Sequence, residues 1–95
     1  MIKFDFVTLK IFITISEVGS LSSAAEREHI AIAAISKRIS DLEATAGTKL
    51  LYRRSRGVEL TPAGHVFLHH ARKILDDVFK LNAELSEYEL GIKVI

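Results

Sequence analysis

The 95-residue sequence has no cysteine, no tryptophan and a single proline, and its five glycines are scattered along the chain. The missing cysteines exclude a disulfide framework and a thiolate zinc site, and they fit a reducing compartment. No apolar run approaches the roughly 18 residues that a membrane-spanning helix requires. Asp5 and Lys10 interrupt the first apolar segment, which argues against a signal peptide. We therefore expect a cytoplasmic protein without membrane contacts.

The sequence also lacks the patterns typical of catalytic sites. Its glycines form neither a phosphate-binding loop nor a dinucleotide-binding fingerprint, and no serine and histidine are arranged as a nucleophile with its base. His65 and His69 have the i, i+4 spacing of a metal pair, with His70 beside them, but the nearest acids, Asp76 and Asp77, are two turns away. We expect no enzyme activity, and no catalytic residue, metal ion or cofactor in this stretch of chain.

Charge is present but unevenly distributed. The formal net charge is only +1, yet residues 37–56 carry six cations and two anions, a net charge of +4. Residues 76–95 carry two cations and five anions, a net charge of −3. A basic middle is expected of a surface that binds phosphates, although an ordinary solvated surface gives the same signal. Charge alone therefore does not decide the function.

Local signals predict three short helices in the first half of the chain. The first covers residues 6–17, with Asp5 as its N-cap and Gly19 beyond its end, and it is so apolar that we expect burial on more than one side. The second covers about 20–29 and begins either at Ser20 or, through a capping box of Ser23 with Glu26, one turn later. Only two residues separate it from the third, which predicts a helix-turn-helix unit.

The third helix is expected over residues 32–46, with Gly47 ending it. At 100° per residue one stripe is aliphatic, and it predicts a buried side made of Ala31, Ile35, Ile39, Leu42 and Ala46. The opposite side is small, hydroxylic and basic, and consists of Ala33, Ser36, Lys37 and Ser40. A helix with such an exposed side can enter a groove without steric obstruction.

Two short β-like runs, at 50–52 and 58–60, follow the third helix. They predict a hairpin whose tip carries Arg53, Arg54 and Arg56, and a hairpin in this place is a wing. Thr61 and Pro62 then give a strong start signal for a last helix, which we expect to run to about Leu90 with Gly91 as its stop.

The last helix carries a heptad seam, with apolar residues stepping alternately by four and by three. The seam consists of Phe67, Ala71, Ile74, Val78, Leu81, Leu85 and Tyr88. Because the chain has no second helix of matching length, we assign the partner to another copy, with the apolar first helix helping to bury it. The alternative is that the seam covers only the core of its own chain.

Several separate motifs resemble one family over residues 4–88, in order and without gaps. They are GSLSSAAER at 19–27, AISKRI at 34–39 followed by Leu42-Glu43, GTKLLYRR at 47–54, and LTPAG at 60–64. Together they resemble the N-terminal domain of LysR-type transcriptional regulators. The resemblance implies a mostly α-helical fold, a winged helix-turn-helix with a three-helix core and a two-stranded wing. A long C-terminal helix links and dimerises it.

The resemblance also implies how the chain is divided. Residues 1–60 are the DNA-binding domain, 61–90 the linker and dimerisation helix, and 91–95 the start of a truncated effector-binding domain. We expect a small-molecule effector for the missing part, and a homodimer, or a tetramer of the full-length regulator. The expected partner is double-stranded DNA with a two-fold or nearly two-fold site. The other class of function left open is a helical dimerisation or protein-interaction module without specific DNA binding.

In such a domain the third helix lies in the major groove and the wing follows the backbone or enters the minor groove. The residues expected at DNA are Ser22, Ser23, Ile32, Ala33, Ser36, Lys37, Arg38, Ser40, Arg53, Arg54 and Arg56. Within this set, Arg38 is expected to reach a phosphate or an acidic neighbour, and Ser22 and Ser23 either bind a phosphate or cap their helix.

The chain departs from the family at the start of the third helix, where Ser-Gln is usual and Ala31-Ile32-Ala33 stands here. Alanine is a poor N-cap, at a cost of about 1 kcal/mol relative to serine. Ile32 either touches a thymine methyl group or packs against the second helix. Base preferences therefore cannot be transferred from relatives that carry glutamine.

Overall fold

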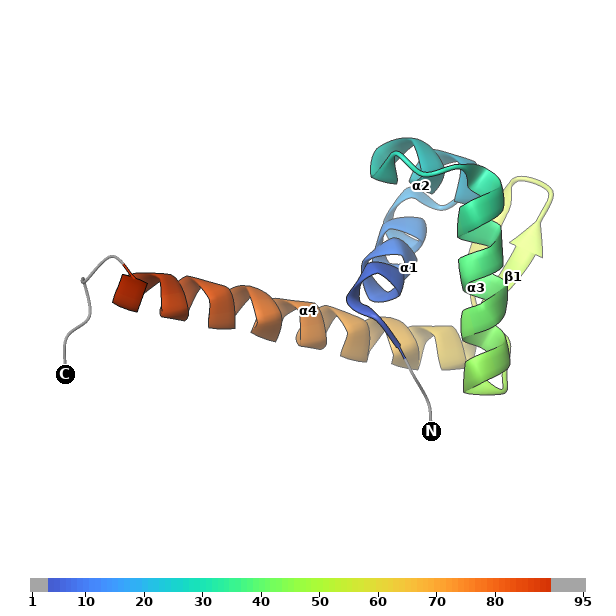
Figure 1. Ribbon diagram of the computed structural model, residues 1–95. Helices are drawn as coiled ribbons and strands as arrows, with labels where there is room; N and C mark the ends of the chain where they lie inside the picture. The colour runs from blue at the N-terminus through green and yellow to red at the C-terminus, as the bar shows by residue number, and fades with distance from the viewer. Residues whose placement is uncertain (1–3, 90–95) are drawn as a thin grey trace.

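The computed structural model describes residues 4–89, which form a winged helix-turn-helix with a long projecting helix. The elements are α1 (Phe6–Val18), α2 (Leu21–Glu28), α3 (Ile32–Ala46), β1 (Leu51–Arg54), β2 (Gly57–Leu60) and α4 (Pro62–Glu89). Helices α1 to α3 and the two strands gather at one end, and α4 extends from them as a rod (Figure 1). The predicted order and type of every element are confirmed.

Local capping explains where the first helices begin and end. The Thr8 amide donates to Asp5 Oδ1 at 2.7 Å, and Gly19 ends α1 in the left-handed region with φ +81°. This amide, more than the Thr8 hydroxyl or the Arg38 charge, lowers the pKa of the Asp5 carboxyl. Ser20 Oγ accepts from the Ser23 amide at 3.1 Å, so α2 begins at the earlier of its two predicted starts.

Helix α3 has the predicted bounds, although its first residue receives no side-chain cap. Ala31 stands at the N-cap position and makes no side-chain hydrogen bond there, as an alanine must. The turn before it is held instead by His29, which adopts φ +57°, and by the Ile30 amide, which donates to Ala25 O at 3.1 Å. Gly47 ends the helix with φ +74°.

The core lies where α1 crosses α2 and α3, and its centre is made by Phe12, Ile11, Ile15, Ile35 and Ile39, all fully buried. Helix α1 is buried on more than one side, as expected, because Thr8, Leu9, Ile11, Phe12, Thr14 and Ile15 are all buried, although Phe6 and Val7 are 57% and 49% exposed. One expectation about burial is wrong. The stripe of α3 is buried only in its middle, because Ala31 is exposed and Ala46 half-buried.

The wing is an antiparallel pair in which Leu51 faces Leu60 and Arg54 faces Gly57. The hairpin prediction is confirmed, but the position of its arginines needs correction. Arg53 and Arg54 belong to strand β1, and only Arg56 lies in the turn. The register explains this, since four consecutive residues on each side are paired and only two are left for the turn.

Two glycines allow the wing to pack closely against the helices. A Cβ atom on Gly57 would overlap the carbonyl oxygen of Gly19, at the end of α1. A Cβ atom on Gly64, in the first turn of α4, would overlap the carbonyl oxygen of Leu50. The Val58 amide also donates to Gly19 O at 3.0 Å. The wing is therefore fixed both to the turn that follows α1 and to the start of α4.

Helix α4 begins as predicted. Thr61 Oγ1 accepts from the Gly64 amide at 2.9 Å and donates to Lys49 O at 2.8 Å. With 28 residues the helix is about 42 Å long. Its expected stop at Leu90 and Gly91, and the segment 91–95 assigned to a further domain, lie outside the described residues. Within residues 4–89, no helix is both long and apolar enough to cross a lipid bilayer.

Candidate nucleic-acid interface

A hollow of about 230 Å³ separates the wing from the first turns of α2 and α3. Eight residues line it: Ser20, Leu21, Ser22, Ile32, Arg53, Arg54, Gly57 and Val58. Four of the residues predicted to contact DNA, from three separate segments of the sequence, therefore share one concave surface. This surface lies between the start of the third helix and the wing arginines.

The wing arginines differ in their surroundings. Arg53 Nη1 donates to Ser36 Oγ at 3.0 Å, which links the wing to the middle of α3. The next side chain along the strand, Arg54, pairs its Nε with Glu59 Oε1 at 3.3 Å and lies 5.4 Å from the centre of the Tyr52 ring. Arg56 is exposed in the turn. The hairpin thus presents a guanidinium toward α3 and another at its tip.

The polar side of α3 is exposed as predicted. Ala33, Lys37 and Ser40 are exposed and Ser36 is half-buried beneath the Arg53 contact. Lys37 Nζ lies 2.9 Å from Asp41 Oδ2, one turn further along the helix. Because most of these side chains are small, the helix can enter a groove with little steric hindrance. Lys37 is the cation on this side.

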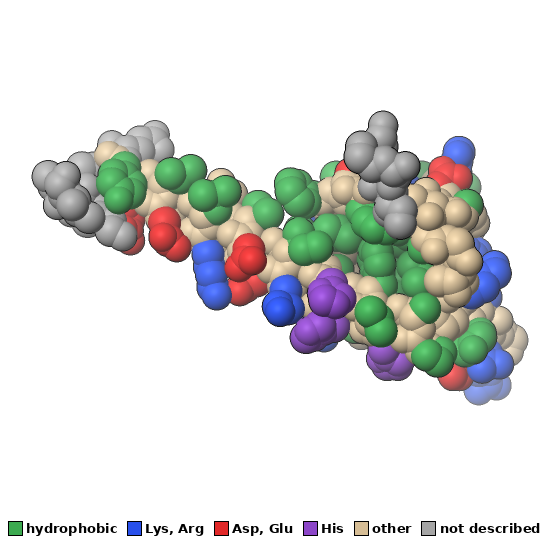
Figure 2. Space-filling model, turned by 90° about the horizontal axis from the view of Figure 1, so that it is seen from below, with side chains coloured by type: hydrophobic (Ala, Val, Ile, Leu, Met, Phe, Trp, Pro, Cys, Tyr) green, Lys and Arg blue, Asp and Glu red, His purple; other side chains and the backbone are tan. Residues whose placement is uncertain are grey.

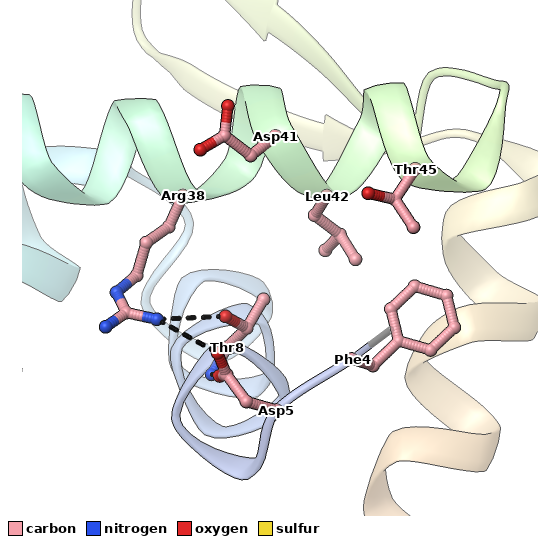
Figure 3. Close-up of a pocket in the computed structure, with 7 residues that line it drawn as sticks. All are labelled: Phe4, Asp5, Thr8, Arg38, Asp41, Leu42 and Thr45. Carbon is pink, nitrogen blue, oxygen red and sulfur yellow. Dashed lines mark hydrogen bonds and ion pairs between the residues drawn. The ribbon is translucent and has the colours of Figure 1, made fainter. Parts of the chain in front are cut away.

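Arg38 does not share that surface. Its Nη1 donates to Thr8 Oγ1 at 3.1 Å and lies 3.5 Å from Asp5 Oδ2, so the guanidinium is turned toward the start of α1 (Figure 3). Of the two partners expected for Arg38, the acidic neighbour is therefore the one found here. Its side chain links α3 to the first turn of α1.

Ser22 and Ser23 are exposed at the start of α2. The Ser23 amide already donates to Ser20 Oγ, and Ser22 Oγ lies 3.5 Å from the same hydroxyl. The side chain that caps α2 is therefore Ser20 rather than Ser22 or Ser23, and the Ser23 amide is already engaged. Ser22 still lines the hollow, where its hydroxyl can reach a phosphate oxygen.

Ile32 is half-exposed, although burial against α2 was one of its two expected roles. Its side chain is 50% exposed and lines the hollow beside Ser22 and Arg53. An apolar side chain left open at the start of such a helix suits contact with the methyl group of thymine. The geometry therefore favours the base-contact role over the packing role.

Sequence reasoning missed the buried carboxylate of Glu43. Its Oε2 accepts from the amides of Leu50 and Leu51 at 2.7 and 3.1 Å, and Lys49 Nζ lies 3.7 Å from Oε1. Glu43 thus joins α3 to the first strand of the wing. Its place four residues after the buried Ile39 was an available signal, because i and i+4 lie on one side of a helix.

The heptad seam of α4 divides into a packed half and an open half. Phe67 contacts Phe12 and Phe4, with ring centres 4.8 and 5.5 Å apart, and Ala71 is only 1% exposed. Beyond these two, Val78 is half-buried and the others are exposed: Ile74, Leu81, Leu85 and Tyr88. Hydrophobic side chains follow one edge of the rod and charged ones the other (Figure 2). The idea that the seam covers only its own core is therefore wrong.

The histidines on α4 form no recognisable metal centre. The rings of His69 and His70 are 5.1 Å apart. Among residues 4–89, no group of three or more histidines, cysteines and acids is placed to hold a metal ion.

Comparisons of sequence and of structure with known proteins agree on one family. Residues 6–65 match the family model of the bacterial regulatory helix-turn-helix protein, lysR family. The transcriptional regulator TcbR of Pseudomonas sp. strain P51 is 46% identical over 72 residues, which are 76% of this chain and 24% of TcbR. TcbR and five other curated relatives are much longer than this chain, which spans about a quarter to a third of their length.

Two solved structures show the same architecture. The DNA-binding domain of CbnR in complex with DNA superposes with a TM-score of 0.86 and 38% identity, covering 90% of this chain and 99% of that one. The DNA-binding domain of BenM with catB site 1 DNA gives a TM-score of 0.85 and 33% identity, over 88% of this chain and 93% of that one.

The bridge made by Glu43 gives a prediction about stability. Glu43→Ala leaves two wing amides without their acceptor, and we expect a loss of about 1–3 kcal/mol in the free energy of unfolding. Glu43→Gln retains an amide oxygen as acceptor and should lose clearly less. Urea denaturation followed by circular dichroism measures both. Equal stability of the alanine variant and the wild type would contradict the bridging role.

Proposed function

Since the chain belongs to the LysR family of bacterial regulatory helix-turn-helix proteins, we propose that it binds double-stranded DNA as a homodimer. In this proposal it is the DNA-binding part of a transcription regulator. The observation that carries the proposal is the shared surface of α3 and the wing, where Ile32, Arg53 and Ser22 line one hollow. The same surface gives no reason to propose an enzyme.

The proposed contacts follow from what each side chain offers. Helix α3 lies in the major groove, with Lys37 and Ser40 toward base edges or flanking phosphates and Ala33 close to the groove floor. Arg53 and Arg56 follow the backbone, and one of them enters a narrowed minor groove. Arg54 and Ser22 add contacts at the rim. We leave Arg38 and Ser23 outside the proposed interface, because the Arg38 guanidinium is turned toward Thr8 and Asp5 and the Ser23 amide is engaged by Ser20.

The structures of CbnR and BenM named above are DNA complexes. Their similarity covers 90% and 88% of this chain, so it supports the same use of the same elements. It does not extend to base preference, because Ile32 stands where the family commonly has glutamine.

Homodimerisation is proposed from the open half of α4. Ile74, Leu81, Leu85 and Tyr88 are each more than 40% exposed along a helix about 42 Å long. Leaving such a row in water forgoes roughly 25 cal/mol for every Å² of apolar surface that a partner would cover. A second α4 has the length and the repeat to cover it, and the exposed Phe6 and Val7 of α1 add apolar area beside it.

The regulator as a whole is larger in this proposal. Because the curated relatives are about three to four times as long as the matched stretch, we propose that a small-molecule effector binds a region outside these 95 residues. We also propose that the regulator works in the cytoplasm, where its DNA is. The assembly of the full-length regulator is a homodimer or a tetramer.

A pure protein-interaction module is the second candidate function, and the open seam alone would support it equally well. The surface between α3 and the wing distinguishes a DNA-binding domain from an interaction module, because an interaction module does not require cations beside a helix with small side chains. Retention of the protein on random duplex DNA at low salt separates the two candidates.

The proposed interface predicts a steep dependence of DNA affinity on salt. If each protomer neutralises about three to five phosphates, the plot of log affinity against log salt concentration should have a slope near −5 to −9 for the dimer. Lys37→Ala should weaken binding several-fold, whereas Lys80→Ala on α4 should not. Fluorescence anisotropy titrations at several salt concentrations measure this. Unchanged affinity of Lys37→Ala would show that the interface is misplaced.

The open seam predicts the oligomeric state. The double substitution Leu81→Glu, Leu85→Glu places two charges in the proposed contact and should give single chains at micromolar concentration. Ala83→Glu, on the same stretch of helix but about 180° from Ile74, should remain dimeric. Sedimentation equilibrium distinguishes the two states. A wild-type protein that is monomeric at this concentration would refute the proposed dimer.

Ile32 predicts a contact that can be tested on the DNA rather than the protein. Replacing thymine by uracil removes only the methyl group, so one position in each half-site should lose about 0.8 kcal/mol, roughly fourfold in affinity. The variant Ile32→Ala should be insensitive to that replacement. A wild-type protein that tolerates uracil at every thymine would place Ile32 away from the bases.

A further inference from the structure

The third helix carries an acid beside the lysine on which the proposed DNA contact depends. Lys37 Nζ lies 2.9 Å from Asp41 Oδ2, and the two side chains are 75% and 66% exposed. We propose that Asp41 restrains DNA binding, because its carboxylate competes with DNA for the Lys37 ammonium. The inference rests on the proposed function, and it adds a residue that weakens affinity rather than one that makes a contact.

The ion pair between Lys37 and Asp41 is weak enough for DNA to replace Asp41 as the partner of the ammonium. In a helix, an acid four residues before a lysine pairs more favourably than an acid four residues after it, and here the order is the weaker one. An ion pair between exposed side chains changes the equilibrium constant of the process that forms or breaks it by only roughly 1.5- to 5-fold. A DNA phosphate or a guanine edge can therefore take the ammonium from Asp41, but each protomer loses the ion pair when it does so.

Within residues 4–89, the cation that Asp41 pairs with is Lys37, and no guanidinium pairs with it. The Asp41 carboxylate points away from the Arg38 guanidinium, which is turned toward Asp5 and Thr8 (Figure 3). When DNA takes Lys37, the Asp41 carboxylate is left beside a phosphate backbone of the same sign. Both effects act in the same direction, against binding.

The wing contains a similar pair, but the geometry there is different. Arg54 pairs with Glu59 and also lies over the Tyr52 ring, so two contacts fix its position. Arg53 is held by the neutral hydroxyl of Ser36. Lys37, in contrast, is paired with an acid one turn further along its own helix and, in the described part of the chain, has no aromatic contact to hold it there.

The test is an equilibrium titration of one duplex with the dimeric protein. Asp41→Asn should bind about two- to fivefold more tightly per protomer, which is roughly 4- to 25-fold for two protomers. Asp41→Glu retains a carboxylate within reach of Lys37 and should behave like the wild type. Asp76→Asn is the matched control, because Asp76 and Lys80 form an i, i+4 pair of the same 2.9 Å length on α4. It should leave affinity within about 1.5-fold.

A double-mutant cycle shows whether Asp41 acts through Lys37. In a Lys37→Met background, which keeps the apolar stem, the tightening caused by Asp41→Asn should shrink to less than twofold. Equal tightening in both backgrounds, or none in either, would overturn the inference while leaving the proposed DNA binding in place. If Lys37→Met binds as tightly as the wild type, the proposed interface itself fails, and the two failures are thereby distinguished.

Discussion

The position of the wing relative to the third helix is the constraint on which the rest of the structure depends. It is set by groups that leave little freedom: the buried Glu43 carboxylate holds the amides of Leu50 and Leu51, and Gly57 lies directly against the carbonyl oxygen of Gly19. A buried acceptor that serves two amides is costly to lose, because those amides have no water to replace it. The helix and the hairpin therefore behave as one surface, and Arg53 reaches Ser36 as a result.

Rigidity of this kind matters because DNA presents its phosphates and base edges at fixed spacings. Contacts at separate positions add to affinity only when the protein holds them at matching positions before binding, since ordering them afterwards costs conformational entropy. Helix α4 likewise has two parts with different surroundings. Its first turns belong to the core through Phe67 and Ala71, whereas the apolar residues of its later turns are exposed. In the proposed dimer, one helix thus connects the fold of a chain to the spacing between two chains.

Much of this fold is readable from the sequence because the relevant signals are local. Asp5 and Ser20 cap the starts of α1 and α2 through contacts within a few residues, and Gly47 ends α3 in the left-handed conformation. The buried position of Glu43 could be read from its spacing of four residues to Ile39, but its partners could not, because the amides of Leu50 and Leu51 are placed only by tertiary packing. The contact between Arg53 and Ser36 could not be predicted either, because it depends on the register of the hairpin. The sequence alone does not tell which apolar residues of α1 are exposed, as Phe6 and Val7 are, because an apolar residue looks the same whether its own core or a partner covers it.

The central claim is that two such surfaces, related by a two-fold axis, meet one duplex. The most direct measurement is hydroxyl-radical footprinting of a duplex selected by the protein from a random pool. The account predicts two protected half-sites of inverted sequence on one side of the duplex, with their centres one or more whole helical turns, about 10 base pairs each, apart. Protection of one isolated half-site would contradict the account.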